Sequence, residues 1–127
     1  MSASLSILVV DDNPSMASAL ADVLDVKGFE VHAAYSGAEA LEILRAHPVD
    51  IMLTDVRMPD MDGVTLYRAT RKTHPNLTTF LMTAYAADDI IQKGMAEGIK
   101  TVFNKPVDIN LLVSMFSACK WLYKKAR

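Results

Sequence analysis

Five short apolar runs, each followed by a longer segment with helical periodicity, divide the 127-residue sequence. In the first run, Ile7-Leu8-Val9-Val10, the apolar residues are continuous and do not alternate with polar ones. Continuous runs of this length are typical of parallel strands that helices cover on both faces. We therefore expect an alternating α/β fold with five strands, over residues 5–10, 29–34, 49–54, 78–83 and 101–104.

Capping signals indicate where the helices between these strands begin and end. Asn13 is a favourable N-cap residue, and Pro14 suits the first position of a helix. Gly28 is suited to end that helix in a left-handed conformation. Ser36 and Glu39 have the spacing of a capping box. The later helices are expected over residues 64–73 and 87–97, and from residue 108 onward.

The composition is that of an ordinary globular domain and argues against several classes of protein. Hydrophobic residues make up 51% of the chain, which is enough for one core. The net charge of -2 lacks the basic excess of nucleic-acid-binding domains, so we expect no direct nucleic-acid partner. The apolar runs are too short for a membrane span or a secretion signal, and we expect a cytoplasmic protein with no membrane partner. The single cysteine, Cys119, is expected to be a buried apolar residue.

Polar side chains stand at the carboxyl ends of four of the five predicted strands. Asp11 and Asp12 follow the first strand, Asp55 follows the third, Thr83 ends the fourth and Lys105 follows the fifth. In an open parallel sheet, the loops at these ends converge where the strand order reverses, and ligands bind there. The acidic pair alone would be a solvated turn that caps a helix. The five residues together predict a binding site.

The chemistry of these side chains favours a metal ion and a phosphate. Three carboxylates in one cleft repel one another and raise each other's pKa unless a cation joins them. Oxygen ligands without nearby histidine or cysteine favour Mg²⁺. The Lys105 ammonium and the Thr83 hydroxyl are suited to hold an anion above the carboxylates. The pattern therefore predicts a site that brings a phosphate to a carboxylate nucleophile.

A family resemblance rests on these residues and on three flanking motifs: Met58-Pro59-Asp60-Met61-Asp62-Gly63, Thr83-Ala84 and Lys105-Pro106. In motifs and spacing, the sequence resembles the receiver domains of two-component response regulators over essentially its whole length. The resemblance implies a flavodoxin-like (βα)5 doubly wound parallel sheet with strand order 2-1-3-4-5. It also leads us to expect that residues 1–127 form a single receiver domain without an output domain.

The resemblance also implies a Mg²⁺ cofactor and its ligands. Asp12 would bind the ion directly and Asp11 mainly through water, with Asp55 as a further member of the metal site. The backbone carbonyl of Arg57 would complete the protein's share of the coordination.

For the phosphoryl group, the resemblance implies Asp55 as the acceptor, with Thr83 and Lys105 holding phosphoryl oxygens. The bond between Lys105 and Pro106 is a candidate cis peptide. The donor would be the phosphohistidine of a histidine kinase or of a histidine phosphotransfer protein. The domain would act as a signalling switch and not as an enzyme. Its fourth helix, fifth strand and fifth helix would face a downstream partner or a second copy in a homodimer.

One position departs from the family pattern. Many receiver domains carry Tyr or Phe three residues before the lysine, where Val102 stands here, and Phe103 should face the other side of the strand. Because valine has little rotamer freedom, we expect coupling through Thr83 and the loop over residues 84–88 instead of an aromatic rotamer exchange. Arg57 and Tyr85 are expected to screen the phosphoryl group from water.

Other functions on a similar scaffold fit the residues less well. A flavodoxin-like electron carrier would need a phosphate loop where Asp11 and Asp12 would repel the anion. A phosphatase with an aspartyl nucleophile needs a second acid two residues later, where Arg57 stands. The sequence has no Walker or G-x-G-x-x-G motif for a nucleotide. An inactive receiver scaffold that serves only for interaction is opposed by the complete set of site residues. The basic end of the last helix, Lys120 to Arg127, is interpreted as solvated.

Overall fold

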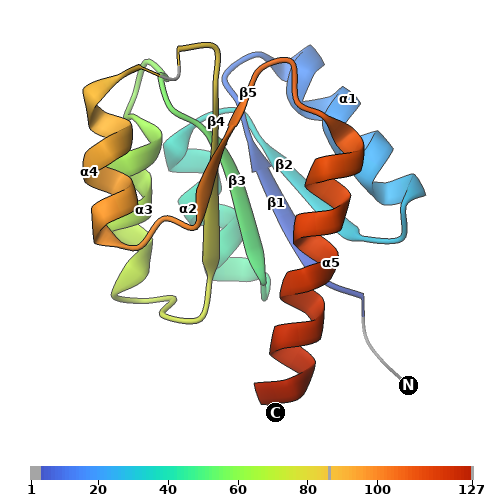
Figure 1. Ribbon diagram of the computed structural model, residues 1–127. Helices are drawn as coiled ribbons and strands as arrows, with labels where there is room; N and C mark the ends of the chain where they lie inside the picture. Colours follow the sequence, from blue (N-terminus) through green and yellow to red (C-terminus); the bar gives the residue numbers. More distant parts are fainter. Residues whose placement is uncertain (1–3, 86, 127) are drawn as a thin grey trace.

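The computed structural model describes residues 4–85 and 87–126, with side chains as far as Cys119. Its centre is a five-stranded parallel sheet in the order β2-β1-β3-β4-β5 (Figure 1). The predicted flavodoxin-like α/β fold and its strand order are therefore confirmed. The elements in chain order are β1 (Ser6–Val10), α1 (Pro14–Val26), β2 (Glu30–Ala34), α2 (Gly37–Ala46), β3 (Ile51–Asp55), α3 (Gly63–Arg71), β4 (Thr78–Thr83), α4 (Asp89–Glu97), β5 (Thr101–Asn104) and α5 (Ile109–Ala126).

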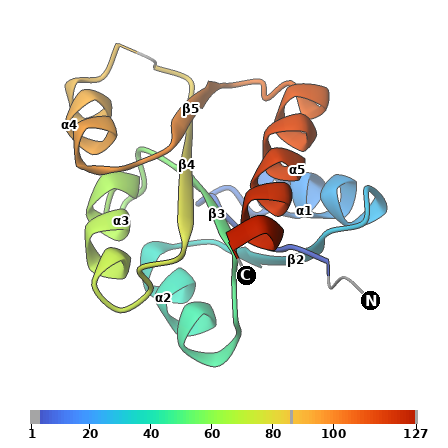
Figure 2. The ribbon, with the colours of Figure 1, turned by 60° about the horizontal axis from the view of Figure 1, so that its bottom comes forward.

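Helices cover both faces of the sheet, as the continuous apolar strands predict. α1 and α5 lie on one face, and α2, α3 and α4 lie on the other (Figure 1 and Figure 2). On the first face, the ring of Phe80 lies 5.7 Å from that of Phe103 and 5.3 Å from that of Phe116 between centroids. Burial of one such ring stabilises the fold by about 1.5–3 kcal/mol. The rigid sheet between these layers positions the loops at its carboxyl edge.

The capping residues act largely as predicted. The Asn13 side chain accepts hydrogen bonds from the backbone at the start of α1, and Ser36 accepts one from the Glu39 N–H at 3.1 Å. The Glu39 carboxylate accepts from the Tyr35 N–H, so the capping box is not closed on Ser36 itself. Gly28 ends α1 with a φ of 100°, which glycine adopts without steric cost.

Several element boundaries differ from the predicted ones by one or two residues, and two of these differences have a clear cause. α4 begins at Asp89 and not at residue 87, because the Asp88 side chain caps the helix by accepting from the Ile90 N–H. β3 begins at Ile51 and not at residue 49. Val49 is apolar because it packs against the core beneath α2, and not because it lies in the strand. Apolar loop residues of this kind lengthen the run that the sequence shows.

Val102 and Phe103 lie on opposite faces of β5, as predicted. Phe103 belongs to the core beneath α1 and α5. Val102 packs against the opposite cluster, which includes Leu81 and Ile91. The ring of Phe103 is therefore on the wrong side of the sheet to stand in for an aromatic residue at position 102.

Two further expectations concern Cys119 and membranes. Cys119 is buried on α5 and free, as expected for a small apolar core residue. Within the described ranges, none of the helices has the length and apolar character that a bilayer crossing requires. The basic residues from Lys120 to Arg127 lie outside the described side chains, and their solvation stays a prediction.

Candidate functional site

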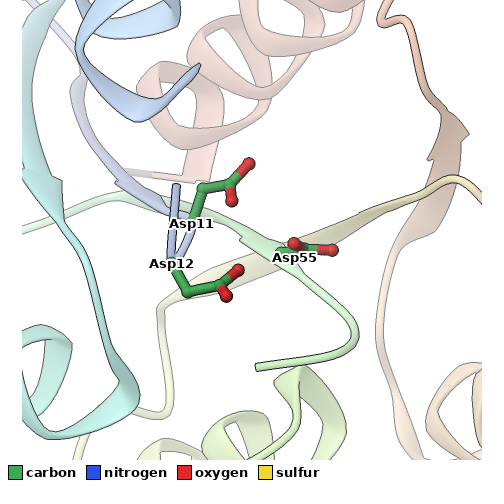
Figure 3. Close-up of side chains that lie close together, drawn as sticks. All are labelled: Asp11, Asp12 and Asp55. Carbon is green, nitrogen blue, oxygen red and sulfur yellow. The ribbon is translucent and has the colours of Figure 1, made fainter. Parts of the chain in front are cut away.

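The carboxyl ends of β1 and β3 bring three carboxylates together. β1 pairs with β3 so that Val10 lies opposite Thr54, and the next residues, Asp11 after β1 and Asp55 at the end of β3, lie side by side at this edge. Together with Asp12, each offers an oxygen atom, and these three atoms lie within 4.8 Å of one another (Figure 3). The structure thus brings together the three acidic residues that the sequence placed at this edge.

Lys105 reaches the same cluster from the far side of β4. Its Nζ lies 3.0 Å from Asp11 Oδ2 and 3.1 Å from Asp55 Oδ2, and it donates a hydrogen bond to each. The peptide bond between Lys105 and Pro106 is cis, as predicted. The Lys105 N–H also donates to the Thr83 carbonyl at 2.8 Å, which fixes the start of the loop between β5 and α5 against β4. One ammonium therefore bridges two carboxylates that follow different strands.

Lys105 offsets only part of the negative charge of these partly buried carboxylates. Burial raises the pKa of Asp55, and this effect outweighs the hydrogen bond and charge of Lys105, which lower it; the charge of Asp11 raises it further. Burial alone would lower the pKa of Lys105, but hydrogen bonds and charge from Asp11 and Asp55 raise it overall. One ammonium thus contacts two of the three carboxylates, and a second cation would relieve the excess negative charge.

The donor set fits a hard divalent cation. Among the described side chains, the potential metal ligands that lie close together here are three carboxylates, with no histidine or cysteine. Asp11 is almost fully buried, whereas Asp12 is exposed. Oxygen ligands of this kind, one of them open to solvent, suit Mg²⁺, which keeps several waters when bound. The Arg57 carbonyl as an additional ligand stays a prediction.

Thr83 lies at the end of β4, as predicted, and is buried. Its Oγ1 accepts a hydrogen bond from the Tyr85 N–H at 2.9 Å. A hydroxyl that accepts with its oxygen still carries its own hydrogen as a donor. That hydrogen is the one that the predicted contact with a phosphoryl oxygen requires, and the contact itself stays a prediction.

The loop between β3 and α3 is closed at its base. The Gly63 N–H donates to the Val56 carbonyl at 2.8 Å. A Cβ atom at Gly63 would overlap the Asp55 carbonyl oxygen and press on the Thr54 side chain, so this close approach requires glycine. The loop therefore leaves Asp55 in one defined direction.

The tip of the same loop is fixed by a contact that the sequence did not indicate. Asp60 accepts hydrogen bonds from the backbone N–H groups of Gly37 and Ala38 at 3.2 and 3.0 Å, at the N-terminus of α2. Burial would raise the pKa of Asp60, but these backbone hydrogen bonds lower it overall. The sequence shows Asp60 within the motif that ends at Gly63, but it does not indicate which groups Asp60 binds.

Arg57 also has a partner that the sequence did not indicate. Its guanidinium donates from Nε to Asp88 Oδ2 at 2.6 Å and from Nη2 to Asp88 Oδ1 at 2.7 Å. Tyr85 is 73% exposed, and the Arg57 side chain is 62% exposed. The predicted screening of a phosphoryl group by Arg57 and Tyr85 stays a prediction, and the structure adds that Arg57 is tied to the start of α4.

An apolar pocket of about 220 Å³ adjoins the site between α1 and the loop from β5 to α5. Lys105 and Asp11 lie at its edge. Its other lining residues are mostly apolar and include Met16, Leu20 and Pro106.

Comparison with known proteins identifies the family. The family model of the response regulator receiver domain matches residues 7–117. The chain therefore belongs to the response regulator receiver domain family, whose place is in two-component signalling.

Curated relatives include both short and long proteins. A response regulator receiver protein of Anaeromyxobacter sp. (strain Fw109-5) is 38% identical over 108 residues, which cover 85% of this chain and 45% of that protein. Sensor kinase CckA of Brucella abortus (strain 2308) is 36% identical over 116 residues, 90% of this chain and 12% of that protein. Sporulation initiation phosphotransferase F of Bacillus subtilis (strain 168) is 34% identical, over 82% of this chain and 84% of that protein. The chain thus spans less than half of the first two relatives.

Solved structures agree with the fold. A response regulator receiver domain protein of Methanospirillum hungatei JF-1 superposes with a TM-score of 0.91 at 24% identity, over 98% of this chain and 100% of that chain. This likeness supports the fold alone. Response regulator protein TrrA of Thermotoga maritima, in complex with Mg²⁺-BeF, superposes with a TM-score of 0.80 at 26% identity, over 91% of this chain and 98% of that chain.

Proposed function

We propose that this receiver domain accepts a phosphoryl group on Asp55 in a Mg²⁺-dependent reaction and thereby switches a surface that a downstream partner reads. The observation that carries the proposal is the Asp55 carboxylate, which accepts a hydrogen bond from Lys105 Nζ at 3.1 Å and lies within 4.8 Å of carboxylate oxygens of Asp11 and Asp12. This carboxylate therefore contacts one cation and belongs to a cluster that would bind a second. Two cations beside one carboxylate offset the repulsion between that carboxylate and an incoming phosphoryl group.

The proposed donor is a phosphohistidine. An Asp55 carboxylate oxygen attacks the phosphorus, a P–O bond forms and the P–N bond to the donor histidine breaks. The imidazole nitrogen leaves with the electron pair of that bond and takes a proton from solvent. Lys105 Nζ and the Thr83 hydroxyl hold phosphoryl oxygens as their charge redistributes. Bound Mg²⁺, held by Asp11, Asp12, Asp55 and the Arg57 carbonyl, would supply positive charge to the phosphoryl oxygens.

The relatives support a protein donor. Their names include a sensor kinase and a phosphotransferase, so a histidine kinase or a histidine phosphotransfer protein is the proposed partner. On this proposal the chain is modified in each cycle, so it acts as a switch and not as an enzyme.

Intact mass after incubation with acetyl phosphate tests the proposal. With Mg²⁺, we expect a gain of one phosphoryl group, which peptide mapping after borohydride reduction should place on Asp55. With EDTA, we expect no gain. Absence of any gain under both conditions would leave the fold standing and would favour a binding module that works without phosphorylation.

We further propose that the switched surface consists of α4, β5 and α5. Val102 is β-branched and packs against the cluster beneath α4, so we predict that its rotamer stays unchanged on activation while the start of α4 moves. Residue 86, within the connecting loop, lies outside the described residues. A crystal structure of the beryllofluoride form should show a shift of residues 84–88, and an unmoved loop would contradict the prediction. A homodimer through the same surface would raise the solution mass of that form.

A further inference from the structure

The ion pair between Arg57 and Asp88 joins the two loops that flank the phosphoacceptor. Arg57 follows β3 by two residues, and Asp88 immediately precedes α4. In the sheet, Asp55 lies opposite Met82 of β4, so the loops that follow β3 and β4 start next to each other. The guanidinium meets the carboxylate with two parallel hydrogen bonds of 2.6 and 2.7 Å. This bidentate geometry is the most specific that an arginine makes.

Asp88 has two functions in this arrangement. Its Oδ1 accepts from the Ile90 N–H at 3.2 Å and so caps α4, while both of its oxygens accept from Arg57. The hydrogen bond from Arg57 lowers the pKa of Asp88, against the effect of burial. The Asp88 side chain is 13% exposed, compared with 62% for Arg57. The carboxylate is therefore held by α4, and the long guanidinium is the partner that is able to move.

A phosphoryl group on Asp55 would compete for that guanidinium. Two residues of extended chain span at most about 7 Å, so the Arg57 side chain starts close to Asp55. A phosphoryl group on Asp55 carries up to two negative charges, and its oxygens accept bidentate hydrogen bonds from arginine. Asp88 carries only one negative charge. The same charge that attracts Arg57 would repel Asp88.

We propose that Asp88 is a positioning residue that holds Arg57 away from the phosphoryl position, and that phosphorylation of Asp55 transfers Arg57 from Asp88 to the phosphoryl oxygens. The inference rests on the proposed function, because it requires Asp55 to be the acceptor. The exchange releases the start of α4 from the loop after β3. It thus supplies a connection from Asp55 to α4. On the face of β5 that is turned toward α4, this chain has Val102 and no aromatic ring.

A double-mutant cycle with Asp88→Asn and Arg57→Gln tests the exchange. Asparagine caps helices as well as aspartate does, so Asp88→Asn removes the charge and retains the start of α4. The measured quantity is the affinity for beryllofluoride in the presence of Mg²⁺, followed by ¹⁹F NMR. With Arg57 present, we expect Asp88→Asn to tighten binding about fivefold, the size of one partly exposed ion pair. In the Arg57→Gln background, we expect Asp88→Asn to tighten binding by less than about twofold, because only the repulsion between Asp88 and the anion is then removed.

Asp89→Asn is the matched control, because it removes the same charge one residue further along, in the first turn of α4. We expect it to leave the affinity within a factor of about two. The inference is overturned if Asp88→Asn has the same effect with and without Arg57, or if it tightens binding no more than Asp89→Asn does. Failure of the parent chain itself to bind beryllofluoride would overturn the proposed function, and the inference with it.

Discussion

Asp55→Asn is expected to gain no phosphoryl group from acetyl phosphate. When both proteins are measured in the absence of divalent cations, the variant is also expected to be more stable than the parent chain. An amide oxygen is a far weaker nucleophile than a carboxylate, so we expect the rate to fall at least about a thousandfold. Intact mass over a time course, with Mg²⁺, measures this loss. Asp22→Asn, on the exposed side of α1, is the control and should be phosphorylated at the parent rate.

The expected gain in stability follows from the raised pKa of Asp55, which burial causes despite the attraction of Lys105. A carboxyl group with a raised pKa binds its proton more tightly in the folded state, so stability is lost as the pH rises from the ordinary aspartate pKa through the folded value. At neutral pH the charged Asp55 therefore opposes folding. Asparagine removes that cost, and Lys105 keeps its hydrogen bond to Asp11.

Urea unfolding in EDTA at neutral pH should show a free energy of unfolding about 1 kcal/mol higher for Asp55→Asn than for the parent. Near pH 4 the difference should shrink, because the parent's Asp55 then binds its proton. A less stable variant would mean that the attraction of Lys105 outweighs the burial of Asp55. The phosphorylation result and the stability result have opposite signs, so misfolding of the variant is not able to produce both.

The sequence was sufficient for the fold and for the residues that end its strands. Continuous apolar runs predict buried parallel strands, and a charged residue that ends such a run is expected at the carboxyl edge of the sheet. For this reason the sequence predicts Asp11, Asp55 and Lys105 at one edge of the sheet, although it does not predict the distances between them. The sheet register then brings Asp55 beside Met82, and Thr83 lies one residue further along β4.

Contacts between loops could not be predicted in the same way. Arg57 and Asp88 are 31 residues apart, and Asp60 binds the backbone of Gly37 across 23 residues. Loop segments have no periodicity that gives the direction of a side chain, so each of these charged residues had several exposed partners available. The absence of an aromatic ring at position 102 was visible in the sequence. The ion pair that offers α4 another connection became visible only in three dimensions.

Lys105→Met is expected to slow phosphorylation by about a hundredfold, the usual cost of removing one group that stabilises a developing negative charge. Methionine retains much of the length of the side chain and removes the ammonium. Without it, Asp11 and Asp55 lose the hydrogen bonds at 3.0 and 3.1 Å, and an incoming phosphate meets uncompensated carboxylates. The rate with acetyl phosphate and Mg²⁺, from intact mass, measures the effect.

Mg²⁺ affinity should respond in the opposite direction, because Lys105 and the metal ion neutralise the same carboxylates. Calorimetric titration of Lys105→Met should therefore show Mg²⁺ binding at least as tight as in the parent, while phosphorylation is slow. Lys100→Met, just before β5 and exposed, is the control and should leave both quantities unchanged. A phosphorylation rate within a factor of about three of the parent's would show that Lys105 does not hold the phosphoryl group. Loss of Mg²⁺ binding together with the rate would instead mean that Lys105 maintains the shape of the acidic cluster.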